Sequence, residues 1–584
     1  MRNLWRTVYR PIHLFFTSVV EDTLRSFSLG GRFLFGVFAG LCILSSLLLL
    51  YFADQATLVT IPAYGSSLTE GVIGAPRFIN PVLAISDSDH DLTSLVYSGL
   101  LRATPSGTYV PDLAQSYTVS PDGLTYTVTL CPNAVFSDGT PVTADDVIFT
   151  IQKTQDSALK SPLQANWAGV TVQKIDERTV QFTLKQPYAP FIDNLTMGIL
   201  PEHLWANVSD QDFPFSTLNI NPIGSGPFTV SSISRGADGV PTAYTLSASQ
   251  YYALGRPYLS SITFSFYPSE SSVEAALRTG AINAAGGLSP ENLSKIGNAP
   301  VVSAPLNRIY GVFFNQAHAP VLQDKTVREA LSMVINKKDL ITQVLKGYGV
   351  AINGPLPSDV DTSTFSTTTL AAAQTLLAKD GWQPGPNGIL QKTNGSGKHA
   401  KTQTLSFSLA TGDTPELRAA AQYLSNTWST LGVQVSVQVF NQGDLAQNVI
   451  RPRAYDALLF GEIIGREPDL YAYWSSTERN DPGLNIAMYA NPTADKILTQ
   501  LRQTSDPQIQ LQLEQQLQTQ LQNDIPALFL YAPDFVYSVP NDVQGLQLGS
   551  IEMPSDRFLS VAGWYRLTDH VWPIFAPHTN NTNR

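Results

Sequence analysis

The most apolar stretch of the chain lies close to its N-terminus. Residues 33–53 contain no charged side chain, and 21 residues in a helix can span a hydrocarbon core of about 30 Å. Arginines precede this stretch and Asp54 follows it, so the positive-inside tendency places residues 1–32 in the cytoplasm and the remainder outside. The pattern predicts a single uncleaved transmembrane anchor in the cell membrane, with a cleaved signal peptide as the alternative.

Beyond this stretch, strand-like and helix-like patterns alternate along the chain. Residues 126–130 and 179–184 alternate between apolar and polar side chains, and turn signals bound both runs. Thr143 is a good N-cap for a helix that extends to residue 153, with acidic residues in its first turn. Further helices are predicted at 325–334 and 415–431. Alternation of this kind is typical of α/β lobes.

Three patterns mark the second half of the chain. A glutamine-rich helix is predicted to begin after Asp506, because apolar side chains recur on one of its faces. These side chains are Ile509, Leu513, Leu517 and Leu521. Residues 384–402 are rich in Gly, Asn and Lys, which predicts a surface loop. Residues 563–584 are polar and Asn-rich, which predicts a tail with no role in the core.

Composition narrows the class of protein. With 584 residues, the chain exceeds the roughly 250–300 residues at which single cores stop growing, so two or more lobes are expected. Hydrophobic residues make up 43% and charged residues 14%, which is enough apolar material for folded cores. The net charge is −11, and because the first 53 residues carry +3, the remainder carries −14. Such a body repels nucleic acid, so no nucleic-acid partner is expected.

The sequence contains no motif for cofactor, metal or catalytic chemistry. The nearest match to a phosphate-binding loop, at 395–399, lacks the first glycine and the hydroxyl residue. Neither a Gly-x-Ser-x-Gly elbow nor a His-Glu-x-x-His pair occurs. Residues 87–91 lack the turn glycine and terminal acid of a calcium loop, and Cys42 and Cys131 predict no disulfide. The chain is therefore expected to use no cofactor and not to be an enzyme.

Several segments resemble, in order, a known family. The most specific is 136–147, with the sequence FSDGTPVTADDV. The other matches are 76–81, 95–101, 111–117, 122–127, 222–228, 277–283, 327–331, 335–337 and 524–526. Together they cover nearly the whole body. They resemble the family 5 extracellular solute-binding proteins, the group that serves oligopeptide, dipeptide, nickel and some sugar importers.

The resemblance implies a fold. It would be an α/β, two-lobed fold of the periplasmic-binding-protein type (class II, cluster C) with an extra inserted domain, preceded here by one transmembrane helix. The expected parts are lobe I at 54–95, 201–310 and 525–562, the inserted domain at 96–200, lobe III at 311–524 and the polar tail at 563–584.

The resemblance also implies a function. The chain would be the extracytoplasmic subunit of an ABC importer that binds peptides in an interlobe cleft and delivers them to a permease, with permease and ATPase on separate chains. Two alternatives stay open. The ligand is a different small solute, such as an oligosaccharide or a metal chelate, or the body is an anchored surface receptor or chaperone without a transporter.

One departure from the family pattern concerns the ligand. Peptide-binding relatives carry an aspartate a few residues before an acidic residue and a proline, and here that position falls on Ile464 or Gly465, so the usual ammonium partner is missing. A buried ammonium left unpaired is costly, so a replacement is expected. Glu462 is the candidate replacement, and Glu467 or Asp469 would serve less directly. The alternative is that Glu462 pairs with Arg466.

Further candidate ligand contacts come from the same segment and from elsewhere. They are Glu467, Asp469, Tyr471, Trp474, Trp167, Tyr97 and Asn315. Tyrosine and tryptophan give flat apolar walls, although their alternation is equally typical of a lobe core. Arg451 and Arg453 are candidates for a ligand carboxylate, with solvated loop charges as the favoured interpretation. No metal ligand is expected.

Overall fold

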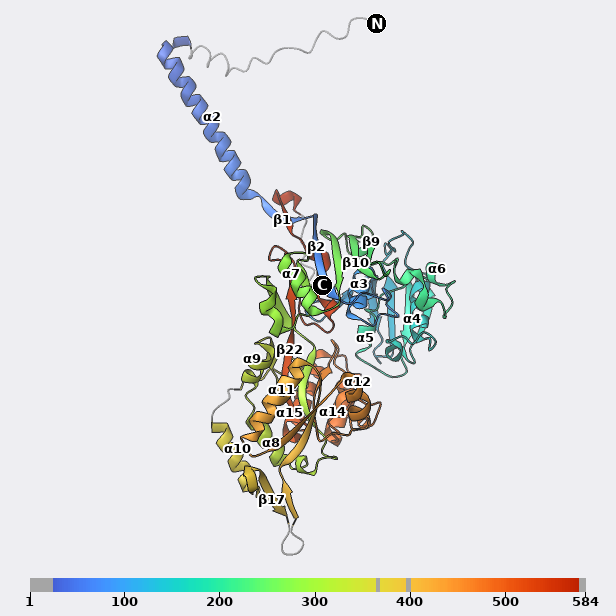
Figure 1. Cartoon of the computed structure of the whole chain (residues 1–584). Coiled ribbons are helices and arrows are strands. Elements are labelled where there is room, and N and C mark those ends of the chain that lie inside the picture. The colour runs from blue at the N-terminus through green and yellow to red at the C-terminus, as the bar shows by residue number, and fades with distance from the viewer. Residues whose placement is uncertain (1–24, 364–367, 395–400, 577–584) are drawn as a thin grey trace. The chain divides into compact units, whose positions relative to one another are not determined.

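The computed structural model describes residues 25–363, 368–394 and 401–576 (Figure 1). It contains two compact units, one of residues 1–63 with 568–584 and one of residues 64–567. Most of the predicted cytoplasmic segment and the last residues of the predicted tail lie outside the described residues.

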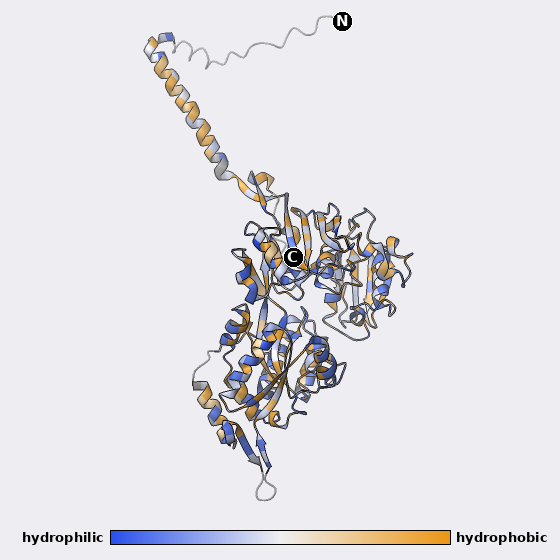
Figure 2. Ribbon diagram, in the orientation of Figure 1, coloured by the Kyte–Doolittle hydropathy of each residue, from blue (hydrophilic) through white to orange (hydrophobic). Residues whose placement is uncertain are grey.

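The first unit is built on one long helix. Helix α2 (Leu29–Thr57) begins after Ser28, whose hydroxyl accepts a hydrogen bond from the Gly31 amide. Its Leu29–Phe52 portion is long and apolar enough to cross a membrane, and Figure 2 shows it as the most continuous apolar helix of the described chain. Strand β1 (Val59–Ala63) follows and pairs with β23 (Leu567–Val571).

The second unit contains one large mixed sheet. Its strands run in the order β20, β19, β21, β14, β22, β12, β2, β11, β10 and β9, and β13 and β15 pair along β22. The bounds are β2 Gly65–Ile73, β9 Phe228–Arg235, β10 Pro241–Ala248, β11 Leu259–Tyr267, β12 Ala284–Gly286, β13 Val301–Pro305, β14 Arg308–Phe314, β15 Gly349–Ala351, β19 Ser406–Gly412, β20 Gln434–Phe440, β21 Ala457–Ile463 and β22 Ala527–Ser538.

Strand β22 belongs to both halves of this sheet. Its first residues pair with β14, where Tyr310 lies opposite Tyr531, and its last residues pair with β13, where Val301 lies opposite Ser538. We name the half with β2 and β9–β13 lobe I and the half with β14, β15 and β19–β21 lobe III. The chain therefore crosses between the lobes between β13 and β14 and again within β22.

Helices cover both lobes. Their bounds are α3 Asp87–Val96, α6 Glu202–Trp205 and α7 Glu270–Thr279 in lobe I, and α8 Lys325–Met333, α9 Lys337–Leu345, α10 Thr368–Lys379, α11 Pro415–Ser429, α12 Gln442–Asp444, α13 Leu470–Trp474, α14 Pro492–Gln503 and α15 Pro507–Asp524 in lobe III. On α15 the predicted apolar face is buried at Leu513, Leu517 and Leu521, whereas Ile509 is 47% exposed. The glutamines fill the remaining faces because only one stripe of this helix meets the core.

A separate core lies within residues 100–199, and we call this part the inserted domain. It contains β3 (Leu101–Ala103), β4 (Tyr109–Pro111), helix α4 (Ala144–Gln155), helix α5 (Phe191–Asn194) and a four-stranded sheet in the order β5, β6, β8, β7. The sheet strands are β5 Ala114–Val119, β6 Thr125–Leu130, β7 Thr171–Asp176 and β8 Thr179–Thr183. The predicted limits of the lobes and of this domain stay predictions.

The most specific sequence motif forms the turn and cap of α4. Gly139 has a φ of 87°, a left-handed value that favours glycine, and the Thr140 amide donates to Asp138. Asp146 then accepts hydrogen bonds from the amides of Thr143 (2.8 Å) and Glu202 (2.8 Å). The motif thus fixes the start of a helix and joins it to the chain that returns to lobe I.

Two predictions about irregular segments are wrong. The predicted loop at 384–402 contains most of a three-stranded sheet of β16 (Gln383–Pro384), β17 (Leu390–Asn394) and β18 (Lys401–Thr404), with 395–400 outside the described residues. The predicted tail begins too early, because Trp564 is 0% exposed in the lobe I core. Both segments consist mainly of polar residues, so the sequence gives little sign of their structure. A short hairpin needs few apolar residues, and Trp564 is a single buried residue in a polar stretch.

A buried ion cluster joins distant segments of lobe I. Arg557, 2% exposed, donates through Nη1 and Nη2 to the two Asp91 carboxylate oxygens at 2.7 and 2.6 Å, and through Nε to Glu70 at 2.7 Å. The Tyr537 hydroxyl donates to the other Glu70 oxygen at 3.0 Å. Burial raises the pKa of both carboxyls, although the guanidinium opposes that shift. Removing the cation would leave two carboxyls without their partner.

We therefore expect Arg557→Met to lower the free energy of unfolding by about 3–5 kcal/mol, the usual cost of breaking a buried ion pair. Chemical denaturation of the full chain in detergent measures this loss. Arg278→Met is the matched control, because Arg278 is exposed at the end of α7 and surface substitutions usually change stability by about 0.5 kcal/mol or less. Equal losses in the two variants would contradict a structural role for the cluster.

Candidate functional site

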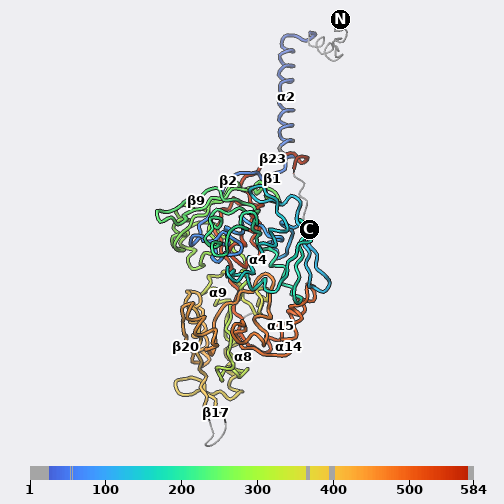
Figure 3. Tube along the Cα trace, turned by 90° about the vertical axis from the view of Figure 1, so that its right-hand side faces the viewer, coloured from blue at the N-terminus to red at the C-terminus, as the bar shows by residue number. Residues whose placement is uncertain are grey.

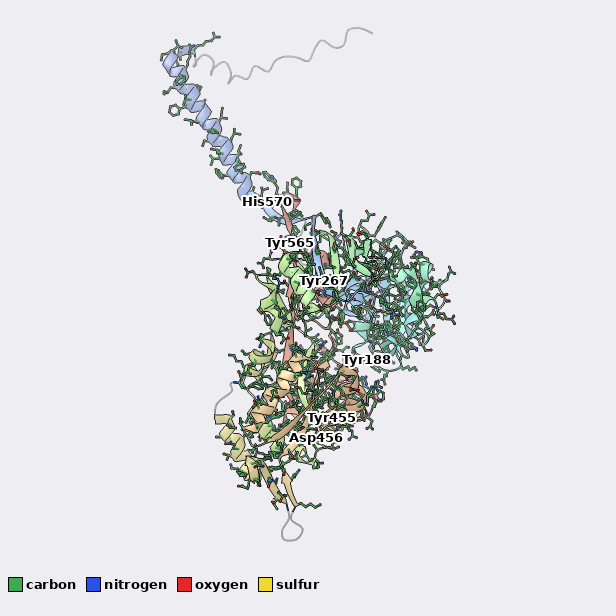
Figure 4. The ribbon with its side chains drawn as sticks, in the orientation of Figure 1. Tyr188, Tyr267, Tyr455, Asp456, Tyr565 and His570 are labelled. Atoms are coloured by element: carbon green, nitrogen blue, oxygen red, sulfur yellow. The ribbon has the colours of Figure 1, made fainter. Side chains whose placement is uncertain are left out.

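A cavity of about 610 Å³ lies between the inserted domain and lobe III. Its volume falls in the range of about 300–1,000 Å³ that is usual for small-ligand sites. The inserted domain contributes Lys185, Tyr188 and Asp193 to its lining, and the segment after β21 contributes Arg466 and Glu467. Figure 4 labels Tyr188 at the border of the two parts.

The segment after β21 enters the cavity because the strand ends in a turn. Gly465 has a φ of 77°, a left-handed value that a residue with a side chain rarely adopts. The turn reverses the path of the chain, and the next two residues line the cavity. The local sequence therefore sets the position of Arg466 and Glu467.

Arg466 connects three parts of the second unit. Its guanidinium contacts Asp193 of the inserted domain at 3.2 Å, and Asp556 and Glu552 of lobe I at 2.8 and 3.7 Å. Its side chain is 9% exposed. Burial opposes its charge, but Asp556, Asp193 and Glu552 together raise its pKa. Arg466 is therefore held as a cation that joins lobe III to the two parts opposite.

A second contact crosses the same boundary. Asp469 accepts hydrogen bonds from Arg502 at 2.8 Å and from the Tyr188 hydroxyl at 3.4 Å. The Arg502 guanidinium also lies 4.6 Å from the Tyr471 ring centre and 5.4 Å from that of Tyr188. Burial raises the pKa of Asp469, while Arg502 lowers it. Tyr188 of the inserted domain thus contacts both members of the Asp469–Arg502 ion pair of lobe III.

Two charged side chains of the cavity lining have no such partner among the described residues. Glu467 and Lys185 form no ion pair and no side-chain hydrogen bond there, although both line the cavity. Burial, with Asp193 adding to it, raises the pKa of Glu467 to about 7. In the same way burial raises the pKa of Glu552 to about 7. A positive charge placed in this cavity would meet an acid that lacks a partner.

The predicted ammonium partner does not line the cavity. Glu462 is 4% exposed, and neither of its carboxyl oxygens has a hydrogen-bond partner. Burial raises its pKa well above the ordinary value. The alternative pairing with Arg466 is also wrong, because the Arg466 guanidinium is bound to other acids. Strand alternation explains the position, since Glu462 faces the same side of the sheet as the buried Leu458.

Among the other predicted contacts, the structure separates cavity residues from core residues. Glu467 lines the cavity. Asp469 and Tyr471 do not line it, but both contact Arg502, which does. As a correction, three aromatic residues are buried in cores and form no accessible wall: Trp474 at 0%, Trp167 at 1% and Tyr97 at 4% exposure. Asn315 is structural, because its side chain donates to the Arg453 carbonyl and accepts from the His318 amide.

Sequence reasoning missed half of the site. Lys185, Tyr188 and Asp193 come from one segment of the inserted domain, whereas Arg502 and Glu552 come from two distant segments, and the five carry no shared local pattern. A Lys-Gln-Pro-Tyr turn after a strand was the one visible signal, since such a turn ends β8 at the cavity. Arg451 and Arg453 lie elsewhere, and Arg453 donates to three backbone carbonyls.

Two lobes linked by crossing strands, with a charged cavity between lobe III and the inserted domain, define a two-lobed binding protein. The chain matches the family described as bacterial extracellular solute-binding proteins, family 5 (middle region), over residues 108–483, and it belongs to that family. The resemblance of the sequence motifs and the fold expected from it are thereby confirmed.

The relatives match over most of their length. The oligopeptide-binding protein AppA of Bacillus subtilis (strain 168) is 28% identical over 501 residues, covering 83% of this chain and 89% of AppA. Protein XP55 of Streptomyces lividans is 29% identical over 497 residues, covering 82% of this chain and 86% of XP55. The solved structure of Bacillus subtilis AppA with a nonapeptide is 27% identical with a TM-score of 0.63, covering 86% of this chain and 99% of that chain.

The raised pKa of Glu467 predicts how stability depends on pH. The folded-state value of about 7 exceeds the ordinary value of 4.5, so the folded state holds the proton more tightly than the unfolded state. Its contribution to stability is present below about pH 4.5 and is lost as the pH rises through about 7. We expect Glu467→Gln to reduce the loss of stability between pH 5 and pH 8 by roughly 1–2 kcal/mol, after allowance for partial solvent exposure.

Chemical denaturation at the two pH values tests this expectation. Glu329→Gln is the matched control, because Glu329 is exposed on α8. If the Glu467→Gln variant loses as much stability as the parent chain between the two pH values, the carboxyl is not held in a desolvated cavity.

Proposed function

We propose that this chain is the peptide-binding subunit of an ABC importer and that Glu467 and Lys185 recognise the charged ends of the peptide. The observation that carries the proposal is the pair of oppositely charged side chains that line one cavity without an ion partner. A peptide has an ammonium at one end and a carboxylate at the other. Each charge needs a partner once water is removed from around it.

The ligand class is also supported by the relatives. AppA, which shares most of its length with this chain, is an oligopeptide-binding protein, and its solved structure holds a nonapeptide. The family's usual ammonium partner is replaced by Ile464 or Gly465 here. Glu467 lies two or three positions further along and lines the cavity, so it takes over that role in the proposal.

Ligand capture would use the two contacts that cross the boundary. Arg466 and the Arg502–Asp469 pair hold lobe III against the inserted domain, with Tyr188 between them. Closing of lobes about a hinge excludes water from the cavity and brings opposite walls onto one ligand. The chain would then deliver the peptide unchanged to a permease, with permease and ATPase as separate chains.

The location follows from the family and the first helix. Members are described as extracellular, which puts the body outside the cytoplasm. We infer that α2 remains uncleaved and spans the membrane, because its charge-free stretch has the required length and arginines lie before it. The helix would tether the binding body to the membrane in which the permease resides.

The peptide prediction concerns the two ends of the ligand. A peptide selected by thermal-shift screening of a library is titrated by calorimetry in its free, N-acetylated and C-amidated forms. We expect N-acetylation to weaken binding to the parent chain roughly 10- to 100-fold, since a charged hydrogen bond contributes about 1.5–3 kcal/mol. In Glu467→Gln, acetylation should change the affinity little, and in Lys185→Gln the same should hold for amidation.

The controls are Glu329→Gln and Lys338→Gln, because both residues are exposed on helices of lobe III. Equal penalties for acetylation in the parent and in Glu467→Gln would remove Glu467 from the site. Binding of an oligosaccharide or a metal chelate in place of every peptide would overturn the ligand class. Recovery of a cleaved peptide by mass spectrometry would show an enzyme.

The anchor has its own test. We expect the full chain to stay in membranes after alkaline carbonate extraction, and Leu44→Arg with Leu47→Arg to release it, because each arginine at a helix centre opposes insertion by about 2.5–3.5 kcal/mol. Leu29→Arg is the control, since it lies at the helix start. An N-terminus that begins after residue 40 in the mature protein would show a cleaved signal peptide instead.

A further inference from the structure

An exposed apolar segment follows the last strand of the first unit. After β23 the chain forms the short helix η12 (Pro573–Phe575). Trp572 is 51% exposed, Ile574 78% and Phe575 71%. Three large apolar side chains within four residues are unusual on the surface of a soluble protein and mark an interaction site.

The segment lies beside the end of the long helix. Strand β1 begins two residues after α2 ends, and β23 pairs with β1, with Thr60 and His570 in hydrogen-bond contact at 3.2 Å. Figures 1 and 3 both show η12, in red, next to the C-terminal end of α2. All these elements belong to the first unit, so the contact does not depend on how the second unit is placed.

The position of residues 572–575 relative to the bilayer follows from the position of α2. The apolar part of α2 ends at Phe52, where Tyr51 and Phe52 are exposed with ring centres 5.8 Å apart. Aromatic rings with one polar edge collect at the border of membrane and water. The five residues from Phe52 to the end of the helix at Thr57 rise by about 8 Å. The base of the helix, where η12 lies, is thus at the level of the lipid headgroups when α2 spans the bilayer.

We propose that Trp572, Ile574 and Phe575 insert into the outer surface of the bilayer and form a second membrane contact beside α2. The inference rests on the proposed anchor. The occupant is the lipid surface because the patch continues the apolar surface of the membrane-spanning helix. Residues 567–576 contain no Lys or Arg, so the contact is apolar and needs no anionic lipid. A single helix can rotate about its own axis, whereas two contacts also fix the rotation and depth of the β1–β23 pair.

The test places a probe in the segment of the full chain. In a Cys42→Ser, Cys131→Ser background, Ile574→Cys is labelled with an environment-sensitive fluorophore, and the chain is reconstituted in phosphatidylcholine nanodiscs. We expect the emission of the label at position 574 to lie at shorter wavelength than the emission of the same fluorophore in water. We also expect strongest quenching by lipids whose nitroxide lies roughly 5–10 Å below the phosphates. Val240→Cys is the control, because Val240 is 48% exposed and belongs to the second unit, which does not contain α2.

The outcomes separate this inference from the anchor. Quenching at position 574 that is lost in Trp572→Ser with Phe575→Ser, while the chain still co-purifies with the nanodisc, supports the inference. A label at position 574 that behaves like the one at position 240 in a chain retained by the nanodisc overturns the inference alone and leaves the patch to a protein partner. A chain that fails to enter the nanodisc overturns the anchor and the inference together.

Discussion

Strand β22 is shared by both lobes, and this constraint limits where the lobes can contact each other. Its residues before Pro533 pair in lobe III and those after it pair in lobe I. The other crossing, between β13 and β14, is bonded to β22 at the same level, because the Leu306 amide donates to the Pro533 carbonyl at 3.0 Å. The lobes cannot separate without breaking a strand, so their relative motion is confined to rotation about these few residues. Contacts between the lobes must then form away from the crossing, where Arg466 and Asp469 lie.

Most charged side chains at the boundary between lobe III and the inserted domain are paired with a charge of opposite sign. Arg466 serves three carboxylates and Arg502 serves one, so the acids that hold the two sides together are compensated locally. Removing water strengthens such pairs and makes an unpaired charge expensive. Among the charged residues of the described lining, Glu467 and Lys185 form no ion pair, and Glu467 is half-buried whereas Lys185 is exposed. In the proposed function, these two side chains lack an ion partner within the described chain because the peptide ends supply it.

The sequence could predict what local physics or a long motif determines. Residues 136–147 form a glycine turn followed by a capped helix, and the capping acid Asp146 and left-handed Gly139 explain why those residue types stand there. The buried stripe of α15 followed from helical spacing alone. The cavity could not be predicted in this way, because Lys185, Arg466 and Glu552 meet only after the lobes assemble. Glu462 shows the limit clearly, since one step along an alternating strand separates this buried side chain from Ile463, which is 50% exposed.

In the proposed function, the protonation state of Glu467 would link the cavity to its ligand. Burial holds the pKa of this carboxyl near 7 in the absence of a ligand, so the site keeps a desolvated acid that is only partly ionised at neutral pH. A peptide ammonium next to it would favour the ionised form, so binding would release a proton at a pH between the lowered pKa of the bound state and about 7. A neutral or anionic solute gives no such relief and leaves the carboxyl as it was. In the proposed function, Glu467 would therefore discriminate by charge, because a ligand without a positive charge does not stabilise the ionised acid.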